Sequence, residues 1–212
     1  MQISCSILSS DNREASVQKL NNTNVDYLHI DVMDGKFVKN TQFPISEIKK
    51  MLSLTTKKAD IHLMVENPLA YIKELRDQNI SYITIHRELD TDLYPIIDEI
   101  KKLNYQVGLS IKPDTSVASL IPYLKDIDLI LVMSVEPGYG KQIFLPRTIN
   151  KLNELNRLRT KYPHLIVEVD GGINDTNIKK LAKAKVDISV VGSYITNNDD
   201  YDLCINKLKG TK

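Results

Sequence analysis

The sequence contains little cysteine, almost no net charge and no long apolar run. Its two cysteines, Cys5 and Cys204, have no CxxC or CxxH neighbour, so the sequence gives no support for a zinc finger or a redox-active cysteine motif. The 28 basic and 27 acidic residues leave a net charge of +1, without the basic excess of a nucleic-acid binder. The longest apolar-rich run, Leu129–Val135, is too short to span a bilayer. We see no signal peptide and expect a soluble cytoplasmic protein that binds neither nucleic acid nor membrane.

The chain also lacks a linker, a low-complexity stretch or a break in composition. Its 212 residues are enough to bury a full core, and we expect one domain spanning residues 1–212. This length is short for a (β/α)8 barrel, which typically has about 250 residues, but barrels of about 200 residues exist. A barrel here should therefore have brief loops and few insertions.

Short β-type runs alternate with longer helical patterns along the chain. Strict alternation predicts a parallel sheet covered by helices. Eight units predict closure into a (β/α)8 TIM barrel of the α/β class, and the alternative is an open doubly wound sheet. The expected strands are Gln2–Leu8, Tyr27–Val32, Asp60–Val65, Tyr82–Arg87, Gln106–Ile111, Leu129–Val135, Ile166–Asp170 and Ile188–Gly192. The expected helices include Arg13–Leu20, Leu69–Gln78, Asp92–Leu103, Pro146–Lys161 and Asp175–Ala182.

Three expected strands carry polar side chains on one face and aliphatic side chains on the other. Side chains alternate between faces along a strand, so the aliphatic set should pack outward against helices and the polar set should point into the barrel. Barrel active sites lie at the C-terminal ends of the strands. The inward sets are His29, Asp31 and Met33 in the second strand, Asp60, His62 and Met64 in the third, and Glu168 and Asp170 in the seventh.

Two histidines and two carboxylates from these sets form a candidate metal site. Ionisable groups in a dry barrel interior are costly unless they are paired or bound to metal. Nitrogen and carboxylate donors together suit Zn²⁺, Fe²⁺, Mn²⁺ or Co²⁺. The alternative is a set of hydrogen-bonded interior residues without metal. The four candidate ligands are His29, Asp31, His62 and Asp170.

Two further patterns point to the same end of the barrel. Met33, Met64 and Met133 fall near strand ends, either as core filler or as an apolar cover over a reaction centre. Glycine-rich turns follow the last three strands, and glycine lets backbone N–H groups approach an anion closely. Each turn alone could be a plain turn, but the grouping favours a phosphate site. The turns are residues 136–141, 170–173 and 192–193.

The remaining histidines have weaker assignments. His86 ends the fourth expected strand and could face inward, with a supporting role favoured over contact with substrate. His164 falls in an expected loop and should be exposed.

These residues closely resemble the ribulose-phosphate 3-epimerase family. The order and spacing of the matching segments agree along nearly the whole chain, and the HxDxMDG and VDGG segments together are highly specific. The matching segments are Ser6–Ser9, His29–Gly35, Asp60–Val65, Val132–Gly138 and Glu168–Ile173.

The resemblance implies a (β/α)8 fold, an isomerase that interconverts D-ribulose 5-phosphate and D-xylulose 5-phosphate, and a homo-oligomer. It assigns one divalent metal ion, with Zn²⁺ or Fe²⁺ before Mn²⁺ or Co²⁺, to His29, Asp31, His62 and Asp170. Asp31 and Asp170 match the acid–base pair, which moves a proton at carbon 3 through an enediolate. The substrate-binding positions carried over are Ser6, His62, Met33, Met64, Met133, Gly138, Tyr139, Gly140, Lys141, Gly171, Gly172, Ile173, Gly192 and Ser193.

The sequence also departs from the family pattern. Cys5 replaces a proline, Lys141 replaces the last glycine of GFGGQ, and Tyr194 replaces a small residue. A lysine at position 141 is strained if that position needs a positive φ. Its ammonium group could instead add attraction for phosphate.

Three other functions remain as alternatives. The nearest is a 3-epimerase of the same family for another ketose phosphate, such as D-allulose 6-phosphate. A more distant one is the orotidine-phosphate decarboxylase group, but its DxKxxD motif has no counterpart in Asp31–Asp34, which lacks the lysine. The third is a non-catalytic phosphosugar-binding paralogue, against which the presence of all four candidate ligands argues.

Overall fold

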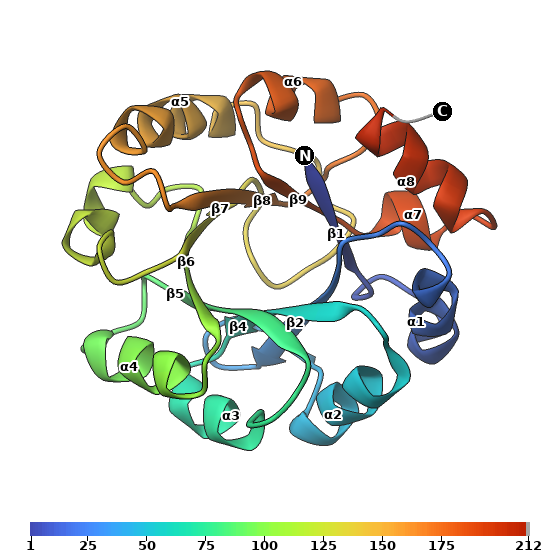
Figure 1. The fold of residues 1–212 in the computed structure, drawn as a ribbon, viewed down its shortest axis with the longest axis horizontal. Helices are drawn as coiled ribbons and strands as arrows, with labels where there is room; N and C mark the ends of the chain where they lie inside the picture. The colour runs from blue at the N-terminus through green and yellow to red at the C-terminus, as the bar shows by residue number, and fades with distance from the viewer. Residues whose placement is uncertain (211–212) are drawn as a thin grey trace.

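Parallel strands close into a barrel in the computed structural model, which describes residues 1–210 (Figure 1). The strands run in the order β1-β9-β8-β7-β6-β5-β4-β2-β3, and parallel pairing of β1 with β2 closes the ring. The predicted TIM barrel is confirmed, and the open-sheet alternative is wrong. The barrel strands are β1 (Gln2–Ser6), β2 (Tyr27–Asp34), β4 (Lys58–Met64), β5 (Ile80–His86), β6 (Gln106–Ile111), β7 (Leu129–Met133), β8 (Ile166–Asp170) and β9 (Ile188–Val191). The two-residue strand β3 (Thr41–Gln42) pairs antiparallel with β2.

Helices surround this ring on the outside (Figure 1). Local signals set several of their ends: the Asn12 side chain accepts from the Ala15 N–H at the start of α1, and Gly210 ends α8 in the left-handed region at φ 71°. The helices are α1 (Arg13–Asn21), α2 (Ile45–Leu54), α3 (Pro68–Glu74), α4 (Tyr94–Lys102), the 3₁₀ helix η1 (Val117–Tyr123), α5 (Thr148–Leu158), α6 (Ile178–Lys183), α7 (Ser193–Thr196) and α8 (Tyr201–Lys209).

The strands separate two packed regions, as the alternating pattern predicts. Outward side chains such as Ile30, Leu63 and Val169 are fully buried in the main core together with apolar side chains of the helices. Inside the barrel, Leu129, Leu131 and Met133 of β7 form part of a separate cluster. This inner cluster keeps the barrel interior apolar along β7.

Several element ends differ from the prediction. Helix α6 begins at Ile178 rather than Asp175, because the side chains of Asn174 and Asn177 hold a turn there. Strand β7 ends at Met133 rather than Val135. The expected exposure of His164 is confirmed. Cys5 is fully buried in β1. Within residues 1–210, no helix is long and apolar enough to cross a membrane.

Candidate active site

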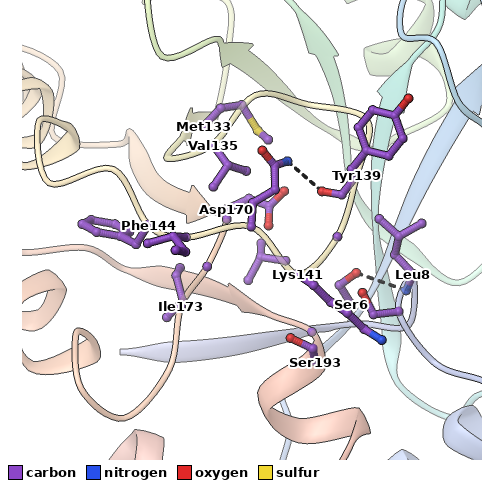
Figure 2. A pocket seen from close by; sticks show the side chains of 18 of the residues that line it. Ser6, Leu8, Met133, Val135, Tyr139, Lys141, Phe144, Asp170, Ile173 and Ser193 are labelled. Carbon is purple, nitrogen blue, oxygen red and sulfur yellow. Dashed lines mark hydrogen bonds between the residues drawn. The ribbon is translucent and has the colours of Figure 1, made fainter.

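A cavity of about 690 Å³ opens where the C-terminal ends of the barrel strands meet (Figure 2). Most of the residues predicted to bind substrate line it, and the two histidines of the candidate metal site do not. His29 and His62 are fully buried and contact the cavity-lining Asp31. The predicted residues that line the cavity are Ser6, Asp31, Met33, Met64, Met133, Gly138, Tyr139, Gly140, Lys141, Asp170, Gly171, Gly172, Ile173, Gly192 and Ser193.

Asp31 lies at the centre of the polar cluster. Its Oδ2 accepts a hydrogen bond of 2.8 Å from Ser6 Oγ. Its Oδ1 lies 3.2 Å from both His29 Nε2 and His62 Nδ1. Burial alone would raise the pKa of Asp31, but the charges of His29 and His62 and their hydrogen bonds hold it well below the ordinary range. Asp31 is therefore an ionised carboxylate whose orientation is fixed by three neighbouring side chains.

Strand register brings this cluster together. Asp31 pairs with His62 across β2 and β4, and Ser6 pairs with His29 across β1 and β2. Asp170 ends β8, on the other side of β1 and β9 in the ring. One possible ligand atom from each of His29, Asp31, His62 and Asp170 lies within 4.8 Å of all the others. This donor set fits a divalent cation such as Zn²⁺ or Fe²⁺, and these four residues could hold one.

The two carboxylates of the site differ in their environment. Burial and the negative charge of Asp31 raise the pKa of Asp170 to about 6. The Asp170 side chain is half-buried at the cavity wall, whereas Asp31 is almost fully buried. Two carboxylates with separated pKa values can act as the base and the acid of a proton transfer.

A second polar layer lies beneath the candidate metal ligands. Asp60 Oδ2 lies 2.7 Å from His29 Nδ1 and accepts a 2.8 Å hydrogen bond from Ser4 Oγ. Burial and the charge of Asp60 raise the pKa of Glu168 well above its ordinary value. Both residues face inward, as predicted. A carboxylate on the far nitrogen of a ligand histidine fixes its ring, so Asp60 supports His29 in the orientation that presents Nε2 to the site.

A second chain of contacts begins at the other histidine. His62 Nε2 lies 2.9 Å from His86 Nε2, and His86 Nδ1 lies 3.0 Å from Glu88 Oε2. Burial lowers the pKa of His86 to about 4. His86 faces inward in a supporting position, as favoured from the sequence. Glu88 is absent from the predicted site. The signal that could have found it is the spacing His86-x-Glu88, which is the same as that of His29-x-Asp31.

The glycine turns pack against one another at the cavity rim. Gly172 has a φ of 64°, and a Cβ atom there would approach the Phe144 backbone nitrogen to 2.4 Å. Only glycine fits this position, because the turn after β8 touches the loop after β7. The Gln142 side chain donates to the carbonyl oxygens of Glu136 and Tyr139, which holds the loop after β7 in its curved path.

Lys141 occupies the left-handed region with a φ of 60°. This confirms the expected strain, since a residue with a Cβ atom is disfavoured there. Figure 2 shows its side chain on the same side of the cavity as Ser6 and Ser193. Tyr194 also lines the cavity, and part of its ring packs against the main core.

The three methionines lie as expected at the cavity wall. Met33 and Met64 pair across β2 and β4 and pack with Val38. Met133 pairs with Asp170 across β7 and β8. All three side chains are nearly fully buried and line the cavity, so apolar surface flanks both carboxylates.

Solved structures share this fold at low sequence identity. A crystal structure of 3-hexulose-6-phosphate synthase aligns with a TM-score of 0.70 at 14% identity and covers 99% of both chains. A thiamine phosphate pyrophosphorylase from Pyrococcus furiosus aligns with a TM-score of 0.66 at 16% identity, covering 99% of this chain and 93% of that one. At these identities the likeness shows the fold alone.

Sequence comparison is more specific. Residues 2–196 match the Ribulose-phosphate 3 epimerase family. A ribulose-phosphate 3-epimerase of Helicobacter pylori (strain J99) is 34% identical over 213 residues, covering 100% of this chain and 98% of that protein. The protein named "Ribulose-phosphate 3-epimerase, cytoplasmic isoform" from Oryza sativa subsp. japonica is 37% identical over 200 residues, covering 92% of this chain and 86% of that protein. The chain belongs to the ribulose-phosphate 3-epimerase family, a family of isomerases.

Proposed function

We propose that the protein interconverts D-ribulose 5-phosphate and D-xylulose 5-phosphate, a reaction of the pentose phosphate pathway, by inverting carbon 3. The observation that carries this proposal is the pair of carboxylates, Asp31 and Asp170, which face one cavity and share a compact donor set with two histidines. The names of the relatives with 34–37% identity support the choice of substrate. The cavity of about 690 Å³ is of a size that suits a small ligand.

Inversion requires removal of a proton next to a carbonyl group and its return on the opposite face. Asp31, held ionised by its two histidine neighbours, takes the proton from one epimer as general base. Asp170, whose pKa is raised to about 6, delivers a proton to the other face of the enediolate. The two residues exchange roles in the reverse direction, which explains why the site needs two carboxylates. Ser6 Oγ holds the Asp31 carboxylate in place through its 2.8 Å hydrogen bond.

One divalent cation completes the site, with Zn²⁺ or Fe²⁺ first and Mn²⁺ or Co²⁺ as alternatives. His29, Asp31, His62 and Asp170 would hold it, because their donor atoms lie within 4.8 Å of one another and combine nitrogen with carboxylate oxygen. When bound, such a cation supplies positive charge that stabilises the enediolate oxygens. The protein contributes the supporting contacts, with Asp60 on His29 and His86 on His62.

The remaining cavity residues bind and cover the substrate. The turns after β7, β8 and β9 line the cavity, and glycine-rich turns at these positions of a barrel can offer backbone N–H groups to a phosphate group. Met33, Met64 and Met133 exclude water from the reacting carbons, which strengthens the electrostatic interactions there. The phosphate contacts, remote from carbon 3, fix the position of the sugar between the two aspartates.

A panel of ketose phosphates tests the choice of substrate. We expect kcat/KM for D-ribulose 5-phosphate to exceed that for D-allulose 6-phosphate by roughly 10- to 200-fold, the discrimination that one additional carbon group allows. Epimerisation is measured by NMR on purified protein with added Zn²⁺ or Fe²⁺. A preference for the hexulose phosphate would move the assignment to that substrate, and binding without turnover of any of them would support the non-catalytic alternative.

Lys141 provides a second test of the phosphate site. Lys141→Gly removes the ammonium group and relieves the positive φ of 60°. We expect KM to rise roughly five- to tenfold, because a charge-assisted contact to phosphate is lost, with kcat nearly unchanged. The free energy of unfolding should rise by about 1 kcal/mol, because glycine adopts this conformation without strain.

Lys185 offers a matched control for this substitution. It is an exposed lysine with a φ of 57° that does not line the cavity. Lys185→Gly should give a similar gain in stability and leave KM unchanged. Lys141→Met, which removes the charge but keeps the Cβ atom, should raise KM without the gain in stability. An unchanged KM in both Lys141 variants would show that the ammonium group does not contact the phosphate.

A further inference from the structure

The chain of contacts behind His62 crosses from one strand to the next. His62 lies on β4, His86 ends β5, and Glu88 follows two residues later. The His62 and His86 rings meet through their Nε2 atoms, which are 2.9 Å apart, with the ring centroids 5.0 Å apart and the ring planes inclined by 28°. Glu88 Oε2 lies 3.0 Å from His86 Nδ1. All four ring nitrogens therefore face a defined neighbour, since His62 Nδ1 faces Asp31 Oδ1 at 3.2 Å.

The contacts of the other Glu88 oxygen determine which atoms donate and which accept along this series of hydrogen bonds. Glu88 Oε1 accepts from the Lys112 backbone N–H at 2.7 Å and from Thr115 Oγ1. A backbone N–H only donates, so Oε1 must be an acceptor. Burial raises the pKa of Glu88, but the hydrogen bonds from His86, Thr115 and the Lys112 N–H lower it to about 2, so the carboxylate is ionised and accepts with both oxygens. The hydrogen between Glu88 and His86 consequently belongs to His86 Nδ1.

The same reasoning continues across the two rings. Two facing ring nitrogens at 2.9 Å form a hydrogen bond only if one donates and the other accepts. His86 is fully buried, which disfavours a charged ring with a hydrogen on both nitrogens. His86 Nε2 then accepts from His62 Nε2–H. The nitrogen of His62 that can offer a lone pair to a cation is therefore Nδ1, which shares a hydrogen with Asp31 Oδ1 at 3.2 Å until a cation takes its place.

We propose that Glu88 and His86 are positioning residues that keep a hydrogen on His62 Nε2, so that Nδ1 is the nitrogen of His62 that can bind a cation in the candidate metal site. The inference rests on the proposed function, because it concerns the cation that this site would hold. It assigns a role to Glu88, which lies outside the donor set of the site. Acting through His86, Glu88 directs His62 Nδ1, and not Nε2, to the cation.

Neighbouring segments hold the positioning residues rigid. The Phe37 ring, from the turn after β2, lies 4.7 Å from the His86 ring. The Lys112 ammonium group, from the loop after β6, lies 4.3 Å from the centroid of the Phe37 ring. Lys112 therefore holds Glu88 through its backbone and covers Phe37 through its side chain. The His86 ring is packed from one side and hydrogen-bonded at both nitrogens, so it has no freedom to flip.

Glu88→Gln tests the proposal with an isosteric change. Whichever way the amide turns, its NH₂ group meets a donor, either the Lys112 N–H or His86 Nδ1–H. The conflict at His86 is relieved if every hydrogen bond in the chain reverses its direction. His62 Nε2 then accepts from His86, and the hydrogen of His62 is fixed on Nδ1, which can offer no lone pair to the site. We expect the affinity for Zn²⁺ to fall roughly 10- to 100-fold. The loss in kcat should be largely recovered at saturating Zn²⁺.

Two substitutions at position 86 separate hydrogen bonding from packing. His86→Phe keeps a ring against Phe37 but offers no acceptor to His62, and it should lose Zn²⁺ affinity as Glu88→Gln does. His86→Gln keeps an acceptor oxygen without the ring, and it should recover part of the affinity. Glu66→Gln is the matched control, because Glu66 is exposed two residues past the end of β4 and should bind Zn²⁺ as the unmodified protein does.

The readouts are the ¹⁵N chemical shifts of the histidine rings in metal-free protein and competition for Zn²⁺ against a chelating dye. The proposal predicts that His62 Nε2 carries a hydrogen in the unmodified protein and loses it in Glu88→Gln. Absence of a hydrogen on His62 Nε2 in the unmodified protein, or unchanged Zn²⁺ affinity in Glu88→Gln and His86→Phe, would overturn it. Failure of the unmodified protein to bind any divalent cation would instead overturn the proposed metal site, so the two failures are distinguishable.

Discussion

Asp31→Asn and Asp170→Asn should each lower kcat by roughly 10³- to 10⁴-fold while the fold remains intact. Each variant removes one of the two groups that exchange a proton with carbon 3, and neither amide can replace it. Both side chains also belong to the set of donors that could hold a cation. The measurement is turnover of D-ribulose 5-phosphate by NMR, with circular dichroism and thermal unfolding to confirm folding.

Asp199→Asn provides the matched control, because Asp199 is exposed and does not line the cavity. It should keep full turnover. The two active-site variants should also differ in thermal stability. Asp31 contacts Ser6, His29 and His62, so its loss should destabilise the protein more than the loss of the half-buried Asp170. Near-normal turnover in either variant would contradict the two-carboxylate mechanism.

Removal of divalent metal should have the second large effect. We expect a chelator to reduce turnover at least about a thousandfold, because the enediolate oxygens then lose the positive charge that the cation would supply. Metal present at about 1,000 times its Kd stabilises a protein by about 4 kcal/mol. For a domain of this size that corresponds to a fall in Tm of roughly 8–16 °C on chelation.

The mutual repulsion of Asp31 and Asp170 in the metal-free protein contributes to the expected fall in Tm. Without a cation, the charge of Asp31 contributes to raising the pKa of Asp170 to about 6, so the pair is destabilised when both are ionised. Readdition of Zn²⁺, Fe²⁺, Co²⁺ or Mn²⁺ should restore turnover and Tm. Ca²⁺ should not, because it prefers an all-oxygen site. Full turnover in protein shown by elemental analysis to be metal-free would remove the cation from the proposed function.

The fold could be predicted from the sequence because two independent signals agree. Alternation of strands and helices predicts the parallel sheet, and alternation within β2, β4 and β8 predicts which face lies inside. Element ends were less predictable. The start of α6 depends on side chains of Asn174 and Asn177 that compete with the helix for backbone groups.

Much of the candidate site could be predicted as well, since a histidine or carboxylate that must face a dry interior is conspicuous. What could not be predicted are contacts that depend on register between neighbouring strands. The 2.9 Å approach of His62 to His86 follows from the pairing of β4 with β5, which includes a register shift at Ala59 and Asp60. Glu88 lies in a loop, where the pattern of alternating faces no longer applies.

The most direct test of the two-aspartate account is the origin of the hydrogen at carbon 3 in the first product formed. Purified protein with Zn²⁺ is mixed with D-ribulose 5-phosphate in D₂O and followed by NMR before the back reaction matters. The account predicts that D-xylulose 5-phosphate carries deuterium at carbon 3 from its first appearance. The aspartate that protonates carbon 3 has already exchanged its own proton for deuterium from the solvent. Product that retains the substrate's own hydrogen, or the absence of any exchange, would contradict it.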